Sequence, residues 1–457
     1  MQSSELTKRK KLPLAPVGVI IFGATGDLAT KKLFPSLARL FADGHLRDFF
    51  IVGLSRQNLN NETFRNYVAS AVGPKYADSN FLSKIEFVQG DFSSPESFQN
   101  LGERIAKIDD VRGVCSDKVY YLAVPPILYG ELLENLATSG LTVTCGGLSR
   151  IAIEKPFGSN YLQAQVLDKK LSVYFKENEI YRIDHYLAKE TIQNILTFRF
   201  SNSIFPPLFT SEHIERIEAV FSEKNVVGSR AGFYESVGAL LDVGQNHILQ
   251  MVAAVTMENP GEILPASIRT LRAEAISRFT FEGKDGDLTV GQYDGYRDEH
   301  GVASISTTET FFKMKFKIIG GILDGVPVTA TSGKGLAESR ASVSVFFKKG
   351  DCTHQNILTF WIQPNEGIAI NFYSKAPGFT KKLASKMLDF SYSEEKDVRL
   401  PDAYERVLFD LLRGDETLFG STDEVMASWR FITPVLEMAK KLPLMRYNQG
   451  TLVEELF

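Results

Sequence analysis

The chain has 457 residues, of which 44% are apolar and 23% are charged, and its formal net charge is −4. This length exceeds what one compact core usually holds and predicts two domains. The near balance of charge leaves no general basic field, which argues against a nucleic-acid-binding protein. No apolar run approaches the roughly 20 residues of a membrane span.

The three cysteines, Cys115, Cys145 and Cys352, form no CxxC pair. This argues against a disulfide framework and against a structural zinc site, and it fits a reducing compartment. Residues 1–12 include a run of four basic residues, Lys8 to Lys11, with no apolar signal-type stretch after it. We therefore expect a flexible basic leader on a cytoplasmic protein.

The first half alternates short apolar runs with helical segments. Val17–Phe22 is almost wholly apolar, which is typical of a strand buried on both faces of a parallel sheet. Later strands are expected at 49–53, 84–88, 119–124 and 150–153. Strands that alternate with helices predict a Rossmann-like, doubly wound parallel sheet.

A small-residue turn follows the first strand and opens a helix. It contains Gly23, Thr25, Gly26 and Asp27 in the pattern GxxGxxA, which has fewer glycines than the fuller pattern GxGxxG. Small residues let a pyrophosphate approach the backbone at a helix N-terminus. The turn therefore predicts a dinucleotide site, with a tight turn that binds nothing as the alternative.

Arg56 stands where the second strand ends, and no acidic residue is there. NAD enzymes usually place an acid at this point for the ribose 2′-hydroxyl, whereas a guanidinium suits a 2′-phosphate. We expect NADP rather than NAD, with an unliganded surface arginine as the alternative. Lys155 follows the strand 150–153 and precedes Pro156, so it is expected where coenzyme and substrate meet, or in an ordinary loop turn.

The run Arg182–Glu190 holds cations, a phenol and a carboxylate just before an apolar helical stretch. If it is helical, His185 and Lys189 share a face, and Tyr186 lies close to it. Together with free N–H groups at a helix start, these side chains predict a phosphate seat. Asp184 cannot bind an anion and is free to orient an imidazole. A solvated turn with a capping Asp is the alternative.

From about residue 214 the pattern changes to alternating segments typical of antiparallel strands, at 214–221, 311–318, 341–347 and 356–363. This predicts an α+β domain built on a large, mostly antiparallel sheet. A long apolar helix is expected at 234–255. Most of its surface looks buried, yet its middle carries Asp242 and His247, which need either internal partners or a polar ligand. On an ideal α-helix these two side chains point about 140° apart.

His247 is one of only six histidines. A neutral imidazole is a natural general base, and a carboxylate on its other nitrogen sets the tautomer. Asp184 is the expected partner. A satisfied core histidine is the alternative.

Taken together, these segments resemble the glucose-6-phosphate dehydrogenase family over nearly the whole chain. The matching stretches are 23–37 (GATGDLATKKLFPSL), 153–158 (IEKPFG), 182–190 (RIDHYLAKE), 234–251, 307–312 (TTETFF), 362–367 (IQPNEG) and 401–415. The resemblance implies a Rossmann-like NADP domain over 13–184 and an α+β substrate and oligomerisation domain over 185–457. It also implies a homodimer or homotetramer.

The resemblance implies the following chemistry. His247 takes the C1 hydroxyl proton of β-glucose 6-phosphate while Asp184 pairs with it, and hydride goes to NADP to give the 6-phosphogluconolactone, the first step of the oxidative pentose phosphate pathway. Phosphate and the near edge of the sugar are held by Lys155, His185, Tyr186 and Lys189. Sugar hydroxyls are bound by Glu223, Asp242, Lys334 and Gln363. The coenzyme is held by Gly23, Thr25, Gly26, Asp27, Arg56 and Lys155.

The chain departs from the family at Leu241, Gly244, Ala188 and Ser339, where Arg, a non-glycine residue, Gly and a second cation are usual. No His/Cys/Asp cluster with ligand spacing appears, so no metal is expected. Three alternatives stay open: another sugar oxidoreductase with an EKP segment, a non-catalytic sensor of sugar phosphate or NADP, and a scaffold.

Overall fold

The computed structural model describes residues 16–143, 146–350, 353–394 and 399–456. The predicted basic leader 1–12 lies outside these residues. The chain forms two compact units. The first unit comprises 1–159, 165–183 and 401–416, and the second comprises 160–164, 184–400 and 417–457. The division is thus not a single cut, because the segment that holds α11 (Ala403–Arg413) returns to the first unit.

The first unit has a parallel sheet whose six strands in this unit lie in the order β6-β5-β4-β1-β2-β3. The strands are β1 Val17–Phe22, β2 Phe49–Ser55, β3 Ile85–Gln89, β4 Asp117–Leu122, β5 Ser149–Glu154 and β6 Ile180–Ile183. The helices include η1 Ala29–Leu33, α1 Phe34–Ala42, α2 Asn61–Val72, α3 Ser79–Ser83, α4 Pro95–Arg112 and α5 Tyr129–Thr138. The helix α6 Tyr161–Tyr174 belongs to this unit from Gln165 onward.

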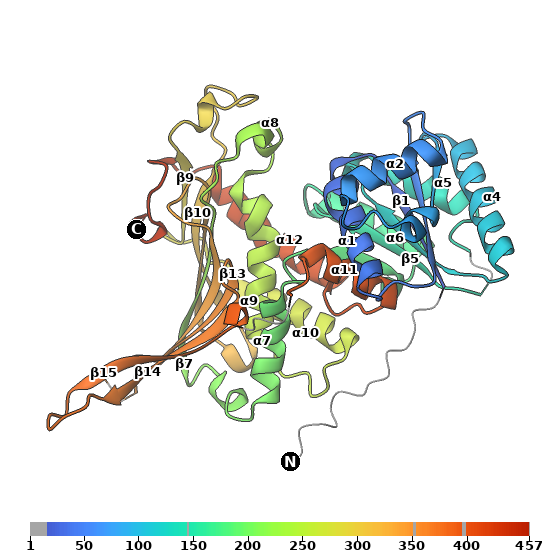
Figure 1. The fold of residues 1–457 in the computed structure, drawn as a ribbon. Coiled ribbons are helices and arrows are strands. Elements are labelled where there is room, and N and C mark those ends of the chain that lie inside the picture. The colour runs from blue at the N-terminus through green and yellow to red at the C-terminus, as the bar shows by residue number, and fades with distance from the viewer. Residues whose placement is uncertain (1–15, 144–145, 351–352, 395–398, 457) are drawn as a thin grey trace, which may run out of the picture. The chain divides into compact units, whose positions relative to one another are not determined.

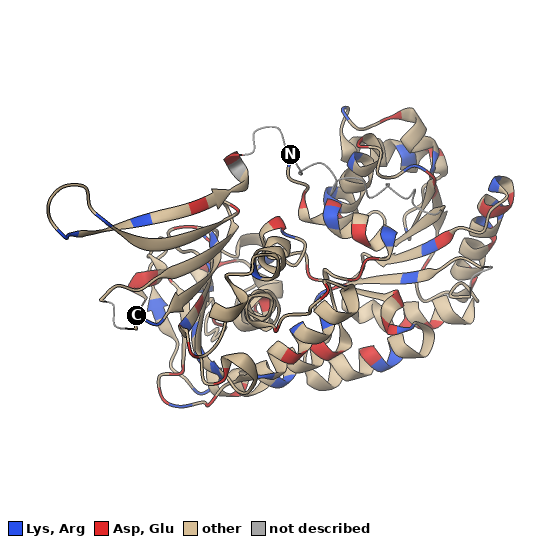
Figure 2. Cartoon of the chain, turned by 90° about the horizontal axis from the view of Figure 1, so that it is seen from below, with Lys and Arg blue, Asp and Glu red and all other residues tan. Residues whose placement is uncertain are grey.

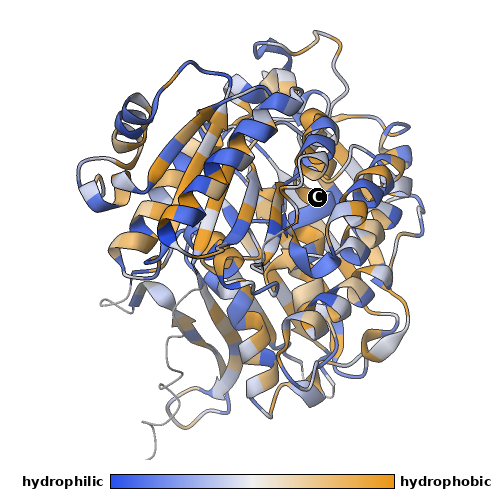
Figure 3. Ribbon diagram, turned by 90° about the vertical axis from the view of Figure 1, so that its right-hand side faces the viewer, coloured by the Kyte–Doolittle hydropathy of each residue, from blue (hydrophilic) through white to orange (hydrophobic). Residues whose placement is uncertain are grey.

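All six residues of β1 are buried, as expected for a strand covered on both faces. Figure 3 shows the strands of this sheet as largely hydrophobic and the helices that flank it as striped, with one apolar face each. The order places β4 and β2 on either side of β1, which is the strand-order reversal at which open α/β sheets bind ligands. The predicted fold of the first half is confirmed.

The second unit is built on a mostly antiparallel sheet of order β15-β14-β13-β12-β7-β11-β10-β9-β17, with β8 paired to β10. The strands are β7 Ile214–Ser222, β8 Phe279–Thr280, β9 Leu288–Tyr293, β10 Phe311–Ile318, β11 Pro327–Gly333, β12 Arg340–Phe347, β13 Ile357–Gln363, β14 Gly367–Lys375, β15 Leu383–Ser391 and β17 Met445–Tyr447. Among the strand pairs of this sheet in the described residues, only β11–β7 and β17–β9 are parallel. The predicted α+β architecture is confirmed.

Helices cover one face of this sheet (Figure 1). They are α7 Glu190–Ser201, η6 Leu240–Ile248, α9 Leu249–Thr256, α10 Pro265–Ser277 and α12 Thr422–Ala439, with the short α8 Ala231–Tyr234 before η6. Alternate residues Ile217, Ala219 and Phe221 of β7 are fully or almost fully buried, which is the period-two pattern of a strand with one face against a core.

Two expectations fail in detail. The helix expected at 234–255 is broken: a loop follows α8, and the segment that carries His247 is a π-helix, η6. The cysteine pattern argued against a disulfide framework and for a reducing compartment, yet Cys115 is disulfide-bonded. The other two cysteines, Cys145 and Cys352, lie outside the described residues.

Charges of both signs are interspersed over the described chain (Figure 2), in agreement with the near-neutral balance. Within the described ranges, no helix combines the length and the apolar character that crossing a membrane requires.

Candidate active site

A buried imidazole–carboxylate pair lies in the second unit. His247 Nδ1 and Asp184 Oδ1 are 2.6 Å apart, and the two residues are 2% and 5% exposed. Because an ionised carboxylate can only accept, Nδ1 carries the proton and the lone pair is on Nε2. This is the tautomer that a general base needs. The structure thus joins two residues that the sequence keeps 63 positions apart.

The run that contains Asp184 is a turn rather than the start of a helix. β6 ends at Ile183 and α7 begins at Glu190. Asp184 Oδ1 accepts the Tyr186 N–H at 3.0 Å, and the Asp184 carbonyl accepts the Leu187 N–H at 3.0 Å. An Asp that bonds the backbone two residues on competes with helix formation. The prediction that His185 and Lys189 share a helical face is therefore wrong.

The turn nevertheless gathers its side chains around His247. The ring centroids of Tyr186 and His185 lie 4.2 and 5.1 Å from that of His247. Tyr186 donates its hydroxyl to Gln363 Oε1 at 3.3 Å, so Gln363 reaches the same place from the end of β13. Burial raises the pKa of Tyr186 well above its ordinary value, and Tyr186 therefore remains a neutral hydrogen-bond donor.

Lys189 is the N-cap residue of α7, and it has a partner that the sequence did not indicate. Glu366 Oε1 lies 3.5 Å from Lys189 Nζ, and Glu366 Oε2 accepts the N–H of Thr191 at 3.3 Å. A carboxylate thus already uses the cation and the helix N-terminus that were expected to hold a phosphate.

Lys334 joins two of the predicted sugar ligands. Its ammonium forms a salt bridge with Glu223 and lies 3.1 Å from Asp242 Oδ2. Lys334 is 4% exposed, and its Nζ lies 5.4 Å from the centre of the Tyr234 ring. Lys334 and Glu223 follow the ends of the paired strands β11 and β7, and Asp242 comes from η6.

The π-helix changes the geometry expected for Asp242 and His247. A π-helix bonds residue i to i+5, so residues five apart lie about one turn apart instead of 140° apart. An added Cβ at Gly244, in the middle of η6, would stand 3.0 Å from the Phe312 ring. Gly244 therefore lets this helix approach β10 closely, which gives a packing reason for one departure from the family pattern.

The coenzyme candidates lie in the first unit. Gly23 follows β1 with φ +81°, and a Cβ there would stand 2.4 Å from the Ala123 carbonyl oxygen. Gly26 donates its N–H to the Gly23 carbonyl at 2.9 Å, and the Thr25 carbonyl accepts from Tyr67 at 3.1 Å. Asp27 is exposed and pairs with Lys31 at 2.8 Å. The turn is thus shaped by glycines and bonded along its backbone, as a pyrophosphate cradle requires.

Arg56 directly follows β2, and Lys155 directly follows β5. Hydrogen bonds from Ser93 lower the pKa of Asp91, and the positive charge of Arg56 adds to this shift. Arg56 is therefore near the end of β3, beside the turn after β1. Lys155 precedes Pro156 through a cis peptide bond, which the sequence did not predict.

Asp184, His185 and His247 offer ligand atoms within 4.8 Å of one another, so they could hold a metal ion. In the predicted chemistry, His247 and Asp184 form the base and its partner, and His185 binds the phosphate. The expectation that the site holds no metal stays a prediction. Sequence reasoning missed Glu366 and Glu309, which lie in matching segments but had no assigned role. Glu309 lies two residues before the apolar strand β10, and an acidic residue in this position is the sequence signal that could have drawn attention to it.

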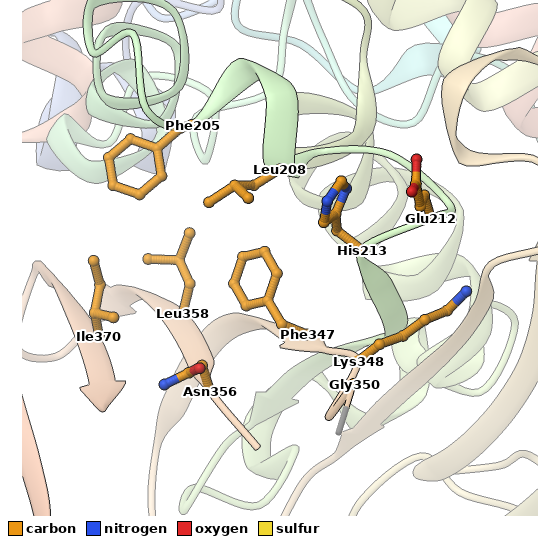
Figure 4. Close-up of a pocket in the computed structure, with 10 residues that line it drawn as sticks. All are labelled: Phe205, Leu208, Glu212, His213, Phe347, Lys348, Gly350, Asn356, Leu358 and Ile370. Carbon is orange, nitrogen blue, oxygen red and sulfur yellow. The ribbon is translucent and has the colours of Figure 1, made fainter. Parts of the chain in front are cut away.

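A separate pocket of about 460 Å³ lies beside the start of β7, and Figure 4 shows the side chains that line it. Its walls include Phe205, Leu208 and Phe347, with His213 and Lys348 among its polar residues. His213 precedes the start of β7, whereas Glu223 follows its end, so the pocket and the predicted sugar ligands lie at opposite ends of this strand. None of the predicted site residues lines it.

The Rossmann-like fold and the buried imidazole–carboxylate pair together point to a nicotinamide-dependent dehydrogenase. Two family models match: "Glucose-6-phosphate dehydrogenase, NAD binding domain" over residues 20–194 and "Glucose-6-phosphate dehydrogenase, C-terminal domain" over 196–454. The chain therefore belongs to the glucose-6-phosphate dehydrogenase family, as predicted, and to the enzymes that oxidise a CH–OH group.

Relatives cover nearly the full length. The chain is 36% identical to the glucose-6-phosphate 1-dehydrogenase of Bacillus subtilis, over 95% of this chain and 94% of the relative. It is 34% identical to that of Borreliella burgdorferi, over 97% and 96%. A solved glucose-6-phosphate dehydrogenase in complex with glucose 6-phosphate is similar with a TM-score of 0.90 and 32% identity, covering 96% of each chain.

An oxidoreductase from Sinorhizobium meliloti shares the fold alone, with a TM-score of 0.52 and 12% identity.

Proposed function

We propose that this chain oxidises β-D-glucose 6-phosphate at C1 to 6-phospho-D-glucono-1,5-lactone. The observation that carries the proposal is the buried His247–Asp184 pair beside the side chains of His185 and Tyr186. Binding alone needs no base with a defined tautomer, so the pair favours an enzyme over a sensor or a scaffold.

His247 Nε2 takes the proton of the C1 hydroxyl as the C1–O bond becomes a carbonyl. Asp184 holds the ring through Nδ1 and stabilises the imidazolium that forms. Bound NADP would supply the acceptor for the hydride that leaves C1. The proton and the hydride together account for the two hydrogens lost by the sugar.

The anionic end of the substrate is held by the turn that precedes α7. His185, Tyr186 and Lys189 supply donors there, and Lys155 is proposed as a further cation. Charge-assisted hydrogen bonds contribute about 1.5–3 kcal/mol each. This anchoring energy positions C1 at the base, and a sugar without phosphate gains none of it.

Glu223, Asp242, Lys334 and Gln363 are proposed to bind the sugar hydroxyls. Lys334 is supported by its contact with both carboxylates, and Gln363 by its contact with Tyr186. Hydroxyl groups donate and accept, so they suit a set that contains both carboxylates and an ammonium.

NADP is proposed over NAD because Arg56 stands at the end of β2, where a 2′-phosphate would need a cation. The Gly23–Asp27 turn and Lys155 complete the proposed coenzyme site. A homodimer or homotetramer, a cytoplasmic location and a place as first step of the oxidative pentose phosphate pathway stay proposals that follow from the family.

The test is an absorbance assay of reduced nicotinamide with the full-length protein. Glucose 6-phosphate and glucose are compared as substrates, and NADP and NAD as coenzymes. We expect turnover with glucose 6-phosphate and NADP. Preference for glucose at equal concentration would contradict the assignment of the phosphate seat.

A further inference from the structure

Glu309 meets the N-terminal end of the helix that carries the proposed base. η6 begins at Leu240 without a side-chain cap from its own N-cap residue, Ala239. Glu309 Oε1 accepts the N–H of Leu240 at 3.0 Å, and the Glu309 carbonyl accepts the N–H of Ala239 at 3.0 Å. A residue from another segment thus satisfies two of the N–H groups that a helix start leaves free.

The backbone before η6 is shaped to admit this carboxylate. Gly238 has φ +67°, and a Cβ at this position would stand 2.3 Å from Glu309 Oε1. Any other residue at position 238 would both strain the backbone and displace the carboxylate. Gly238 and Glu309 therefore act as a matched pair at the start of the helix.

The carboxylate of Glu309 has no cationic partner among the described residues. The titratable groups that sense its charge are tyrosines. Burial first, and then the charges of Asp242 and Glu309, raise the pKa of Tyr234. Burial, Glu235, Glu299 and Glu309 raise that of Tyr296. Burial raises the pKa of Glu309 itself to about 7. The Glu309 carboxylate is therefore stabilised by the N–H group of Leu240 at the helix start and not by an ion pair.

The C-terminal end of the same helical segment is held by a buried cation. Arg199, on α7, donates to the carbonyls of Ala254 and Met257 at 3.2 and 2.9 Å, in the last turn of α9. Anions at a helix N-terminus and cations at its C-terminus both complement the helix dipole. The segment 240–256 is therefore held at its start by a hydrogen-bond acceptor and at its end by a cation, with His247 between them.

We propose that Glu309 is a positioning residue for catalysis: by capping the π-helix it sets where His247 stands relative to the bound sugar. This inference rests on the proposed function, because it acts through His247. Glu309 would act on the position of the His247 imidazole. Misplacing a catalytic group by about 1 Å costs on the order of 10²-fold in rate.

The test compares Glu309→Ala with Glu309→Gln in the full-length protein, by kcat and KM for glucose 6-phosphate at pH 8. Alanine removes the acceptor, and we expect kcat to fall about 10- to 100-fold. KM should rise less than kcat falls, because Asp242 on η6 shifts with the helix while the proposed phosphate seat lies on another segment. Glutamine keeps an acceptor oxygen and should restore kcat to within about threefold.

Ser421→Ala is the matched control. Ser421 caps α12 by accepting the Glu424 N–H at 3.2 Å, and α12 belongs to the same unit but carries no proposed catalytic group. Its loss should lower the unfolding temperature and leave kcat unchanged. If Glu309→Ala does not fold, Gly238→Ala tests the pair from the other side and should lower kcat in the same way.

The inference fails if Glu309→Ala keeps the wild-type kcat, or if glutamine and alanine lower it equally. A wild-type protein without activity on glucose 6-phosphate would instead contradict the proposed function, so the two failures are distinct.

Discussion

The proposed coenzyme turn and the proposed sugar site use charge in opposite ways. Beside the coenzyme turn, the Asp27–Lys31 ion pair is open to solvent, with side chains 86% and 69% exposed. In the sugar site, the Lys334 side chain is 5% exposed and sits between Glu223 and Asp242. Exposed pairs contribute little, whereas a buried charge is costly unless it keeps its partners. The coenzyme turn therefore depends on backbone shape, and the sugar site depends on side-chain charges that must be present together.

The largest expected effect comes from removing the base. His247→Asn should lower kcat about 10²- to 10⁴-fold, the usual contribution of a general base. Coenzyme affinity, measured by fluorescence titration with reduced NADP, should stay unchanged. A variant that reduces NADP at the full rate would show that the buried pair is structural.

The second prediction compares the buried ion pairs of Lys334 with the exposed Asp27–Lys31 pair. Lys334→Met leaves two carboxylates facing each other and should destabilise the fold by about 3 kcal/mol, the low end for a broken buried pair because Glu223 and Asp242 keep some solvent. KM for glucose 6-phosphate should also rise. Lys31→Met is the matched control and should cost less than about 0.5 kcal/mol in a denaturant titration. Equal losses of unfolding free energy in the two variants would show that the two regions depend on their ion pairs to the same degree.

The third prediction is a pH dependence of stability. Burial raises the pKa of Glu309 from its ordinary 4.5 to about 7. Between these values the folded state keeps a proton that the unfolded state has lost, so stability falls as pH rises through this window, by up to about 3 kcal/mol. Glu309→Gln cannot ionise and should lack this decline. Denaturant unfolding of both proteins at pH 5 and pH 7.5 measures the difference, and parallel losses would contradict it.

The smallest effect is expected at the coenzyme. Arg56→Ala should raise KM for NADP about tenfold, the loss of one charge-assisted contact, and leave KM for NAD unchanged. Initial rates with each coenzyme measure it. A similar rise for both coenzymes would mean that Arg56 does not read the 2′-phosphate.

The first half of the chain could be predicted because its signals are local. Val17–Phe22 is apolar at every position and proves to be a strand at those residues. Gly23 was expected to turn the chain, and its φ of +81° shows why glycine is needed. In such regions the burial pattern and the turn chemistry follow from neighbours in sequence.

The sugar site could be predicted only in part because its geometry comes from distant residues. The π-helix was missed since it depends on close packing of Gly244 against Phe312 and on Glu309, which lie more than sixty residues away in sequence. The turn at Asp184 was missed although its Asp-to-backbone bond is a local signal. The grouping of Lys334 with Glu223 and Asp242 came from the family resemblance, and no spacing rule would have supplied it.

The carboxylate of Glu366 has a consequence for how the substrate arrives and leaves. It already holds Lys189 and the first turn of α7. At the proposed phosphate seat, a substrate phosphate would therefore replace one negative group by another, and Lys189 would keep a counter-charge throughout. The binding free energy from this turn would then be the difference between two anions, which would keep affinity moderate and ease release of the oxidised sugar.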